Sequence, residues 1–227
     1  MCPATHPPTG VPDTDPAYER FLGALVAGDR QQCRDLFDGW LADGTELRVL
    51  YQDRVQRALY AIGVLWEQGR VTVATEHLAS AITEGLLNRV TPQLLALPKN
   101  GKSVVVSCTA NEYHQIGGRM VADFFEMNGW RSYFLGANVP VDEVIALIRD
   151  KRPDAVALSL AIYFNLDTLL ETVRAIRAAF SAIPILVGGH AFEDGGREQV
   201  ESIPGVHLLA SLQDLEAWMN AEGRDAH

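Results

Sequence analysis

The sequence predicts a helical bundle followed by a doubly wound α/β domain with a parallel sheet. Residues 15–97 carry apolar side chains at helical spacing only. From Gly101 onward, short apolar runs alternate with amphipathic helical patterns, which is typical of a parallel sheet with right-handed crossovers. The polar turn cluster at residues 98–101 lies between these two patterns and marks the expected domain boundary.

The first part reads as four helices. Asp15 and Pro16 suit the N-cap and first turn of the first helix. Gly69 suits the end of the long third helix. The apolar stripes cover residues 18–26, 33–41, 47–66 and 78–90. Four helices joined by short turns predict an antiparallel four-helix bundle over residues 15–97. Residues 1–14 are rich in Pro and Thr and are expected to form a disordered tail.

The second part, residues 101–227, reads as alternating strands and helices. Strands are predicted at 103–108, 132–135, 154–160 and 184–187, with a weaker fifth at 206–209. Helices are predicted at 117–128, 141–151, 166–180, 194–202 and 212–221. This alternation favours the flavodoxin-like strand order.

Composition excludes several classes of function. The chain is 48% hydrophobic and 21% charged, as is ordinary for globular proteins. Its net charge of −10 argues against autonomous binding to DNA or to an anionic membrane, since both need a basic face. There is no long apolar run for a membrane helix and no secretory signal pattern. Three scattered cysteines fit reduced thiols, and we expect a cytoplasmic protein.

The most informative stretch is residues 111–117, between the strand at 103–108 and the next helix. In doubly wound folds, ligands bind outside the carboxyl ends of the strands, so His114 is expected to face the ligand crevice. Glu112 is placed to hold the other imidazole nitrogen, as carboxylates do for metal-bound histidines. Gly117 would let a bulky ligand approach the backbone closely.

Further residues extend this pattern along the chain. In order they are Glu112-x-His114-x-x-Gly117, then Ser159-x-Ala161, then Gly188-Gly189. Residue types and spacing resemble the cobalamin-binding signature Asp-x-His-x-x-Gly, Ser-x-Leu, Gly-Gly. Glu112 stands where the family has Asp, and Ala161 stands where it has Leu.

The resemblance implies a specific mode of cofactor binding. His114 would be the lower cobalt ligand, in place of the cofactor's own dimethylbenzimidazole. The displaced nucleotide tail would run past Ser159 and over Gly188 and Gly189, where absent side chains leave room.

A second motif, Trp66-x9-Glu76-His77, spans the turn between the third and fourth predicted helices. From the residues alone, Trp66 could be core packing and Glu76 could simply favour a helix N-terminus. Together with the first signature, the motif resembles the CarH-type light sensors, which bind adenosylcobalamin. The resemblance implies that the bundle caps the upper face of the corrin. Trp66 would shield the adenosyl group, and Glu76 and His77 would contact or orient it.

The function implied is a stand-alone adenosylcobalamin-binding light sensor and not an enzyme. Light would break the cobalt–carbon bond, change bundle packing and signal to a protein partner such as a transcription regulator. The family's N-terminal DNA-binding helix-turn-helix has no counterpart before residue 15, so no direct DNA binding is expected. Glu67 stands where some relatives have a cobalt-capturing histidine, and His77 is a possible substitute. The sequence leaves a homo-oligomer open.

Other interpretations remain. A corrinoid methyl-carrier subunit of a methyltransferase system shares the two-domain plan and the lower histidine, but a bulky Trp66 would obstruct access to cobalt. A haem-binding relative is disfavoured by the serine and Gly-Gly spacing, which suits a corrin tail.

Cys108 is expected to be a buried structural thiol and not a nucleophile. His190 could line the same crevice, and Arg174 and Arg177 are expected on a solvated helix face.

Overall fold

The computed structural model describes residues 15–222 and divides the chain into two compact units between Val90 and Thr91. The expected tail, residues 1–14, lies outside the described residues. The division falls before the expected end of the bundle at residue 97, because α6 (Thr91–Ala96) packs against α7 (Ile116–Met127) of the second unit. No helix within residues 15–222 is long and apolar enough to cross a membrane.

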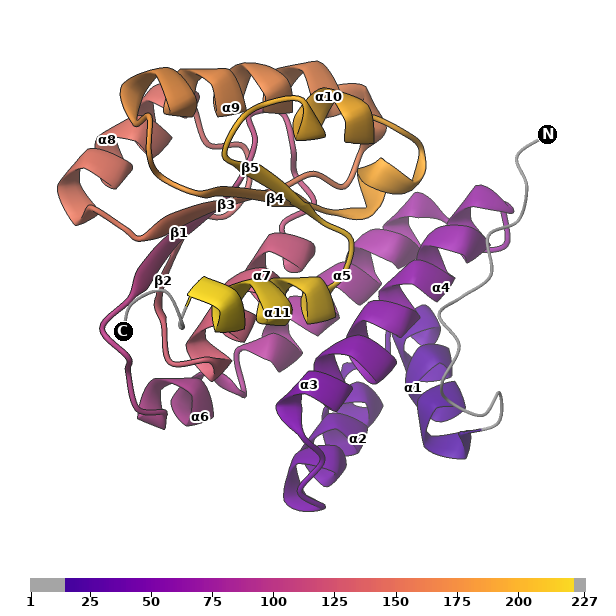
Figure 1. Ribbon diagram of the computed structural model, residues 1–227. Helices are drawn as coiled ribbons and strands as arrows, with labels where there is room; N and C mark the ends of the chain where they lie inside the picture. Colours follow the sequence, from indigo (N-terminus) through magenta and orange to yellow (C-terminus); the bar gives the residue numbers. More distant parts are fainter. Residues whose placement is uncertain (1–14, 223–227) are drawn as a thin grey trace. The chain divides into compact units, whose positions relative to one another are not determined.

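The first unit, residues 15–90, is helical, and the predicted four-helix bundle is confirmed (Figure 1). The third predicted helix is continuous from Leu47 to Glu67, but its middle is a π-helix, which the periodicity did not anticipate. The elements are α1 (Pro16–Ala27), α2 (Arg30–Ala42), α3 (Leu47–Val49), η1 (Leu50–Gln56), α4 (Arg57–Glu67) and α5 (Val73–Leu87).

Aromatic side chains fill the core of this helical unit. Phe21, Phe37 and Tyr51 are completely buried, and the rings of Phe21 and Trp40 meet edge to face with centroids 5.2 Å apart. Asp15 caps α1 as predicted, because its Oδ1 accepts a hydrogen bond from the backbone N–H of Ala17 at 2.8 Å.

The second unit is a five-stranded parallel sheet with the order β2-β1-β3-β4-β5, so the predicted flavodoxin-like order is confirmed. The strands are β1 (Ser103–Cys108), β2 (Arg131–Phe134), β3 (Ala155–Ser159), β4 (Ile185–Gly188) and β5 (Val206–Leu209). The remaining helices are α8 (Val141–Lys151), α9 (Leu166–Ala179), α10 (Arg197–Glu201) and α11 (Leu212–Glu222). Figure 1 shows α7 and α11 on one face of the sheet and α8, α9 and α10 on the other.

Branched aliphatic residues of the central strands form the core of this sheet unit. Val105, Val156 and Ile185 lie on three neighbouring strands and are completely buried, with Ile148 and Leu169 packed over them from α8 and α9. The direction of chain progression reverses between β1 and β3. Ligands of doubly wound folds bind at this switch point.

Arg177 corrects one expectation, because it is not part of a solvated helix face. Its Nη1 donates to the carbonyl oxygens of Ser181 at 2.9 Å and Ile183 at 2.8 Å, and its Nη2 donates to that of Gly205 at 2.7 Å. The guanidinium therefore fastens the end of α9 to the entries of β4 and β5. Arg174, on the same helix, is exposed as expected.

We expect Arg177→Ala to lower the free energy of unfolding of the sheet unit by about 2 kcal/mol, because several carbonyl groups lose a charged donor. Urea unfolding monitored by circular dichroism measures the loss. Arg174→Ala is the matched control and should be close to neutral. Equal stability of the two variants would contradict the fastening role of Arg177.

Candidate functional site

The site is built on the β1 loop, residues 109–115, at the carboxyl end of the first strand. Asn111 adopts a left-handed conformation with φ of 65°, which Asn tolerates better than most residues. Its backbone N–H donates to Oδ1 of Asn138 at 2.9 Å, and the N–H of Asn138 donates to the carbonyl of Glu112 at 2.9 Å. The β1 loop is thus tied to the segment that follows β2.

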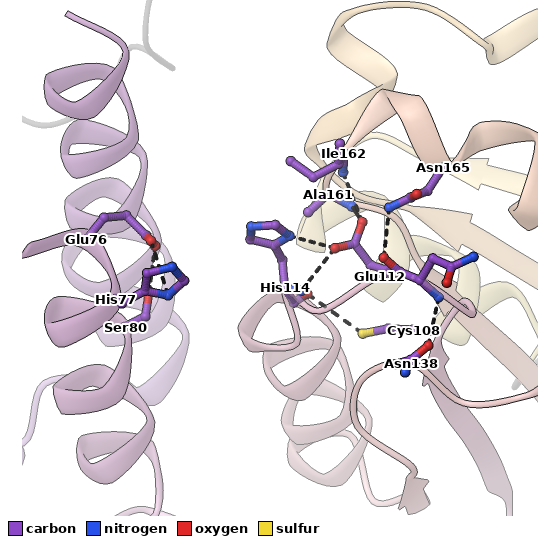
Figure 2. A network of polar contacts seen from close by, with 11 residues as sticks. Glu76, His77, Ser80, Cys108, Glu112, His114, Asn138, Ala161, Ile162 and Asn165 are labelled. Atoms are coloured by element: carbon purple, nitrogen blue, oxygen red, sulfur yellow. Dashed lines mark hydrogen bonds and ion pairs between the residues drawn. The ribbon is translucent and has the colours of Figure 1, made fainter. Parts of the chain in front are cut away.

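Glu112 is completely buried and is the centre of the site (Figure 2). Its Oε1 accepts from the backbone N–H of His114 at 3.0 Å and lies 2.6 Å from Nδ1 of the same residue. Its Oε2 accepts from the backbone N–H groups of Ala161 at 3.1 Å and Ile162 at 3.0 Å. One carboxylate therefore joins the β1 loop to the β3 loop, residues 160–165, across the switch point.

These contacts keep the Glu112 carboxylate ionised. Burial by itself would raise its pKa, but the hydrogen bonds from the ring and backbone of His114 and from the backbone of Ile162 outweigh that effect. The pKa falls from its ordinary 4.5 to about 2. An ionised carboxylate accepts a hydrogen bond from Nδ1–H of His114 and so favours the tautomer in which Nε2 carries the lone pair.

His114 combines a fixed ring with access from outside. Its side chain is 55% exposed, although its carboxylate partner is buried. Within residues 15–222, no group of three or more His, Cys, Asp or Glu side chains gathers to hold a bare metal ion. A single exposed imidazole with Nε2 as the donor atom suits one axial position of a metal that a macrocycle already holds.

Cys108 lies beneath this loop and is structural. Its side chain is completely buried, and its Sγ is 3.7 Å from the carbonyl oxygen of His114. Burial, together with the charge of Glu112, raises the pKa of the thiol to about 12. A thiol that stays protonated near neutral pH is a poor nucleophile.

Gly117, at the start of α7, lies close to Ser159, at the end of β3. A Cβ on Gly117 would be 3.6 Å from Oγ of Ser159, and one on Gly118 would be 3.3 Å from Sγ of Cys108. Gly118 therefore lets the first turn of α7 approach the ends of β1 and β3, whereas a Cβ on Gly117 would make only an ordinary van der Waals contact. Gly117 is also exposed, whereas Gly118 is buried.

Gly188 and Gly189 are both required by the protein's own backbone. A Cβ on Gly188 would be 2.9 Å from the carbonyl oxygen of Leu209, and one on Gly189 would be 2.0 Å from that of Leu160. Gly189 also has φ of 126°, which other residues rarely adopt. Chain packing explains both glycines before any ligand is considered.

The second motif lies within the helical unit, on α4 and α5. Trp66 is 49% exposed, so it does not end in the core as a simple continuation of the buried stripe. Glu76 accepts from Oγ of Ser80 at 2.9 Å, and its other oxygen is 3.7 Å from Nδ1 of His77 (Figure 2). The His77 side chain is 74% exposed. Glu76 is therefore fixed by its neighbours, and the two rings are accessible.

Sequence reasoning missed several members of the site. The backbone amides of Ala161 and Ile162 have no signal in residue type. Asn165 donates through Nδ2 to the carbonyl of Asn111 at 3.2 Å, a second link between the two loops. The signal that could have located them is the strand order, which places the ends of β1 and β3 side by side. His190 pairs with Glu193, with its Nδ1 3.2 Å from Oε1 of the glutamate.

Comparison with known families agrees with this geometry. One sequence-family model described as "B12 binding domain" matches residues 102–208, which is most of the sheet unit. A second model, also described as "B12 binding domain", matches residues 17–91, which is the helical unit. Together the two matches span most of both units, and they support the conclusion that the chain is a cobalamin-binding protein.

Within that class the chain is similar to two regulators from Myxococcus xanthus. It is 26% identical to the HTH-type transcriptional repressor CarA over 219 residues, covering 95% of this chain and 72% of CarA. It is 29% identical to the HTH-type transcriptional repressor CarH over 207 residues, covering 90% of this chain and 67% of CarH. The chain is thus a CarH-like protein.

The fold also matches a solved corrinoid protein. The monomethylamine corrinoid protein of Methanosarcina barkeri superposes with a TM-score of 0.75 at 15% identity, over 88% of this chain and 94% of that one. This likeness concerns the fold. The predicted helical bundle followed by a flavodoxin-like sheet is therefore confirmed by both sequence and structural comparison.

The residues present fit a corrinoid. A corrin supplies four equatorial nitrogens to cobalt and needs only axial donors from the protein. The fixed, half-exposed imidazole of His114 has the chemistry of such a donor. When bound, cobalamin supplies a cobalt centre with an exchangeable upper ligand, and the chain supplies the position and environment of that centre.

We expect Glu112→Gln to lower the free energy of unfolding of the apoprotein by about 2–3 kcal/mol near pH 7, because the new amide group must face backbone N–H donors. The folded-state pKa of Glu112 is lowered from 4.5 to about 2. Its stabilisation is therefore present above pH 4.5 and is lost as the pH falls toward 2, so the two proteins should converge in acid.

Urea unfolding over a pH series checks this prediction. Glu143→Gln, which changes an exposed glutamate of α8, is the control and should stay within experimental error of the unaltered protein. A Glu112→Gln protein that is as stable as this control at pH 7 would show that the buried carboxylate is not fastening the loops.

Proposed function

We propose that the chain is an adenosylcobalamin-dependent light sensor that regulates transcription through a protein partner. The single observation that carries the proposal is the presence in one chain of a carboxylate-held, exposed His114 in the sheet unit and of a Trp66-x9-Glu76-His77 motif in the helical unit whose two rings are exposed. Support also comes from CarA and CarH, which are named as transcriptional repressors.

The sheet unit supplies the lower side of the site in this proposal. His114 binds cobalt through Nε2 and is positioned by Glu112. Ser159, Gly188 and Gly189 would hold the nucleotide tail once it is displaced from cobalt. The close packing of both glycines against neighbouring carbonyl groups keeps this stretch of surface without side chains.

The helical unit supplies the upper side. Trp66 shields the adenosyl group, and Glu76 and His77 contact or orient it. Adenosylcobalamin has a cobalt–carbon bond that visible light breaks. An exposed indole gains apolar contact from such a ligand and loses it when the ligand leaves, which gives the bundle a packing difference between the two states.

The output is a change in protein association. The chain carries a net charge of −10, which does not suit direct contact with DNA. We propose a transcription regulator as the partner, with a second copy of this chain as the alternative form of association. In this proposal the chain acts as a regulator and not as an enzyme.

A corrinoid methyl carrier is the competing function, because the chain shares its fold with the monomethylamine corrinoid protein. A carrier must present its cobalt to partner enzymes in turn. A large indole on the upper side obstructs that approach, so the exposure of Trp66 favours the sensor.

The first test is spectroscopic. Protein loaded with adenosylcobalamin in darkness should show a stable spectrum without dimethylbenzimidazole coordination, and green light should change it irreversibly. The His114→Ala protein should still bind adenosylcobalamin, although more weakly, and it should lose the spectral signature of histidine coordination. A light-stable complex that exchanges methyl groups with a methyltransferase would favour the carrier, and an unchanged His114→Ala spectrum would contradict the assigned ligand.

A second test separates detection of light from response. Trp66→Ala should keep the light-induced spectral change but lose the accompanying change in oligomeric state or partner binding, because the indole no longer reports the upper ligand. Size-exclusion chromatography in darkness and after illumination measures the response. Tyr60→Ala, at another exposed aromatic of α4, is the matched control. A full response in the Trp66 variant would remove the indole from the signalling route.

A further inference from the structure

Exposed apolar side chains concentrate beside the Glu112 network. Five large hydrophobic side chains are exposed in the described part of the sheet unit, and four of them lie on the β1 and β3 loops. Their exposures are 68% for Tyr113, 43% for Ile162, 41% for Tyr163 and 93% for Phe164. Leu95, on α6, is the fifth at 69%.

The loops that carry these side chains are rigidly held. Ile162 donates its backbone N–H to the buried Glu112 carboxylate, and Asn165 donates to the carbonyl of Asn111. The ring of Tyr163 lies against Gly195 of the same unit, since a Cβ built on that glycine would be 3.4 Å from the ring. Ile162, Phe164 and Tyr113 are therefore presented to the outside by fixed backbone, which is unusual for large apolar groups unless something covers them.

The position of His114 indicates which ligand would cover these apolar side chains. Tyr113 precedes His114 directly, and the Ile162 amide shares the Glu112 carboxylate with the His114 ring. Figure 2 shows His114 and Ile162 extending to the same side of the network. A corrin has an apolar ring face with amide side chains at its rim, and it is several times wider than an imidazole. With its cobalt on His114, it must extend over the immediate neighbours of that ring.

We propose that Tyr113, Ile162 and Phe164 form an apolar seat for the corrin macrocycle, with Phe164 as its largest contact. This proposal rests on the proposed lower-ligand role of His114 and adds to it the residues that determine how tightly the macrocycle is held. The seat would bind the ring itself and not the nucleotide tail. It would also exclude water from the cobalt–histidine bond.

The test measures binding in darkness with two probes, adenosylcobalamin and adenosylcobinamide, which lacks the nucleotide tail. Phe164→Ser and Tyr113→Ser should each weaken binding of both probes by about 10-fold, because each loses part of a large apolar contact. The absorption spectrum of bound cobalamin should stay that of the histidine-coordinated form. Leu95→Ser, at an equally exposed leucine of the same unit, should bind like the unaltered protein.

Other outcomes overturn the seat. Affinities equal to those of Leu95→Ser would show that the macrocycle does not touch these residues. A loss confined to adenosylcobalamin would assign them to the nucleotide tail, and unchanged affinity with altered oligomeric state would assign them to contact between copies. Thermal unfolding by circular dichroism confirms that each variant is folded. Because no light is used, an unaltered protein that binds but does not respond to light refutes only the sensor.

Discussion

A single buried carboxylate determines the geometry of the site. Glu112 has no exposed surface, and an unpaired charge in that position would cost several kcal/mol. The charged carboxylate is stabilised by four N–H donors. These are the backbone and ring N–H groups of His114 and the backbone N–H groups of Ala161 and Ile162. Satisfying the charge therefore forces the β1 and β3 loops together at the switch point of the sheet. The imidazole is oriented by the same requirement that keeps the two loops joined.

The two units divide the chemistry by what each leaves exposed. The sheet unit buries its polar anchor and exposes an imidazole flanked by apolar side chains, which suits a metal macrocycle that needs one axial donor. The helical unit buries its aromatic core but exposes Trp66 and His77 at neighbouring helix ends. The proposed function assigns the lower cobalt ligand to the sheet unit and the contacts to the upper ligand to the helical unit, and each unit matches a B12-binding domain model.

Sequence patterns predicted the fold well because periodicity and strand order follow from burial alone. The strand at 103–108 agrees residue for residue with β1, and the pairing of Glu112 with His114 followed from their spacing. Local pattern could not reveal the π-helix at Leu50–Gln56, because its buried residues also fit an ordinary helix. It also misplaced Arg177, whose acceptors are backbone carbonyls, and missed the amides of Ala161 and Ile162. Contacts to backbone leave no trace in residue type.

Electron paramagnetic resonance of bound cob(II)alamin tests the central claim most directly. An axial nitrogen splits each cobalt line according to its nuclear spin, so ¹⁴N gives a triplet and ¹⁵N a doublet. Protein labelled with ¹⁵N at histidine and loaded with unlabelled cob(II)alamin should show doublets, and His114→Ala should abolish them. Triplets that persist in the labelled protein would mean that the cofactor's own base remains on cobalt, and the account of His114 as the lower ligand would be wrong.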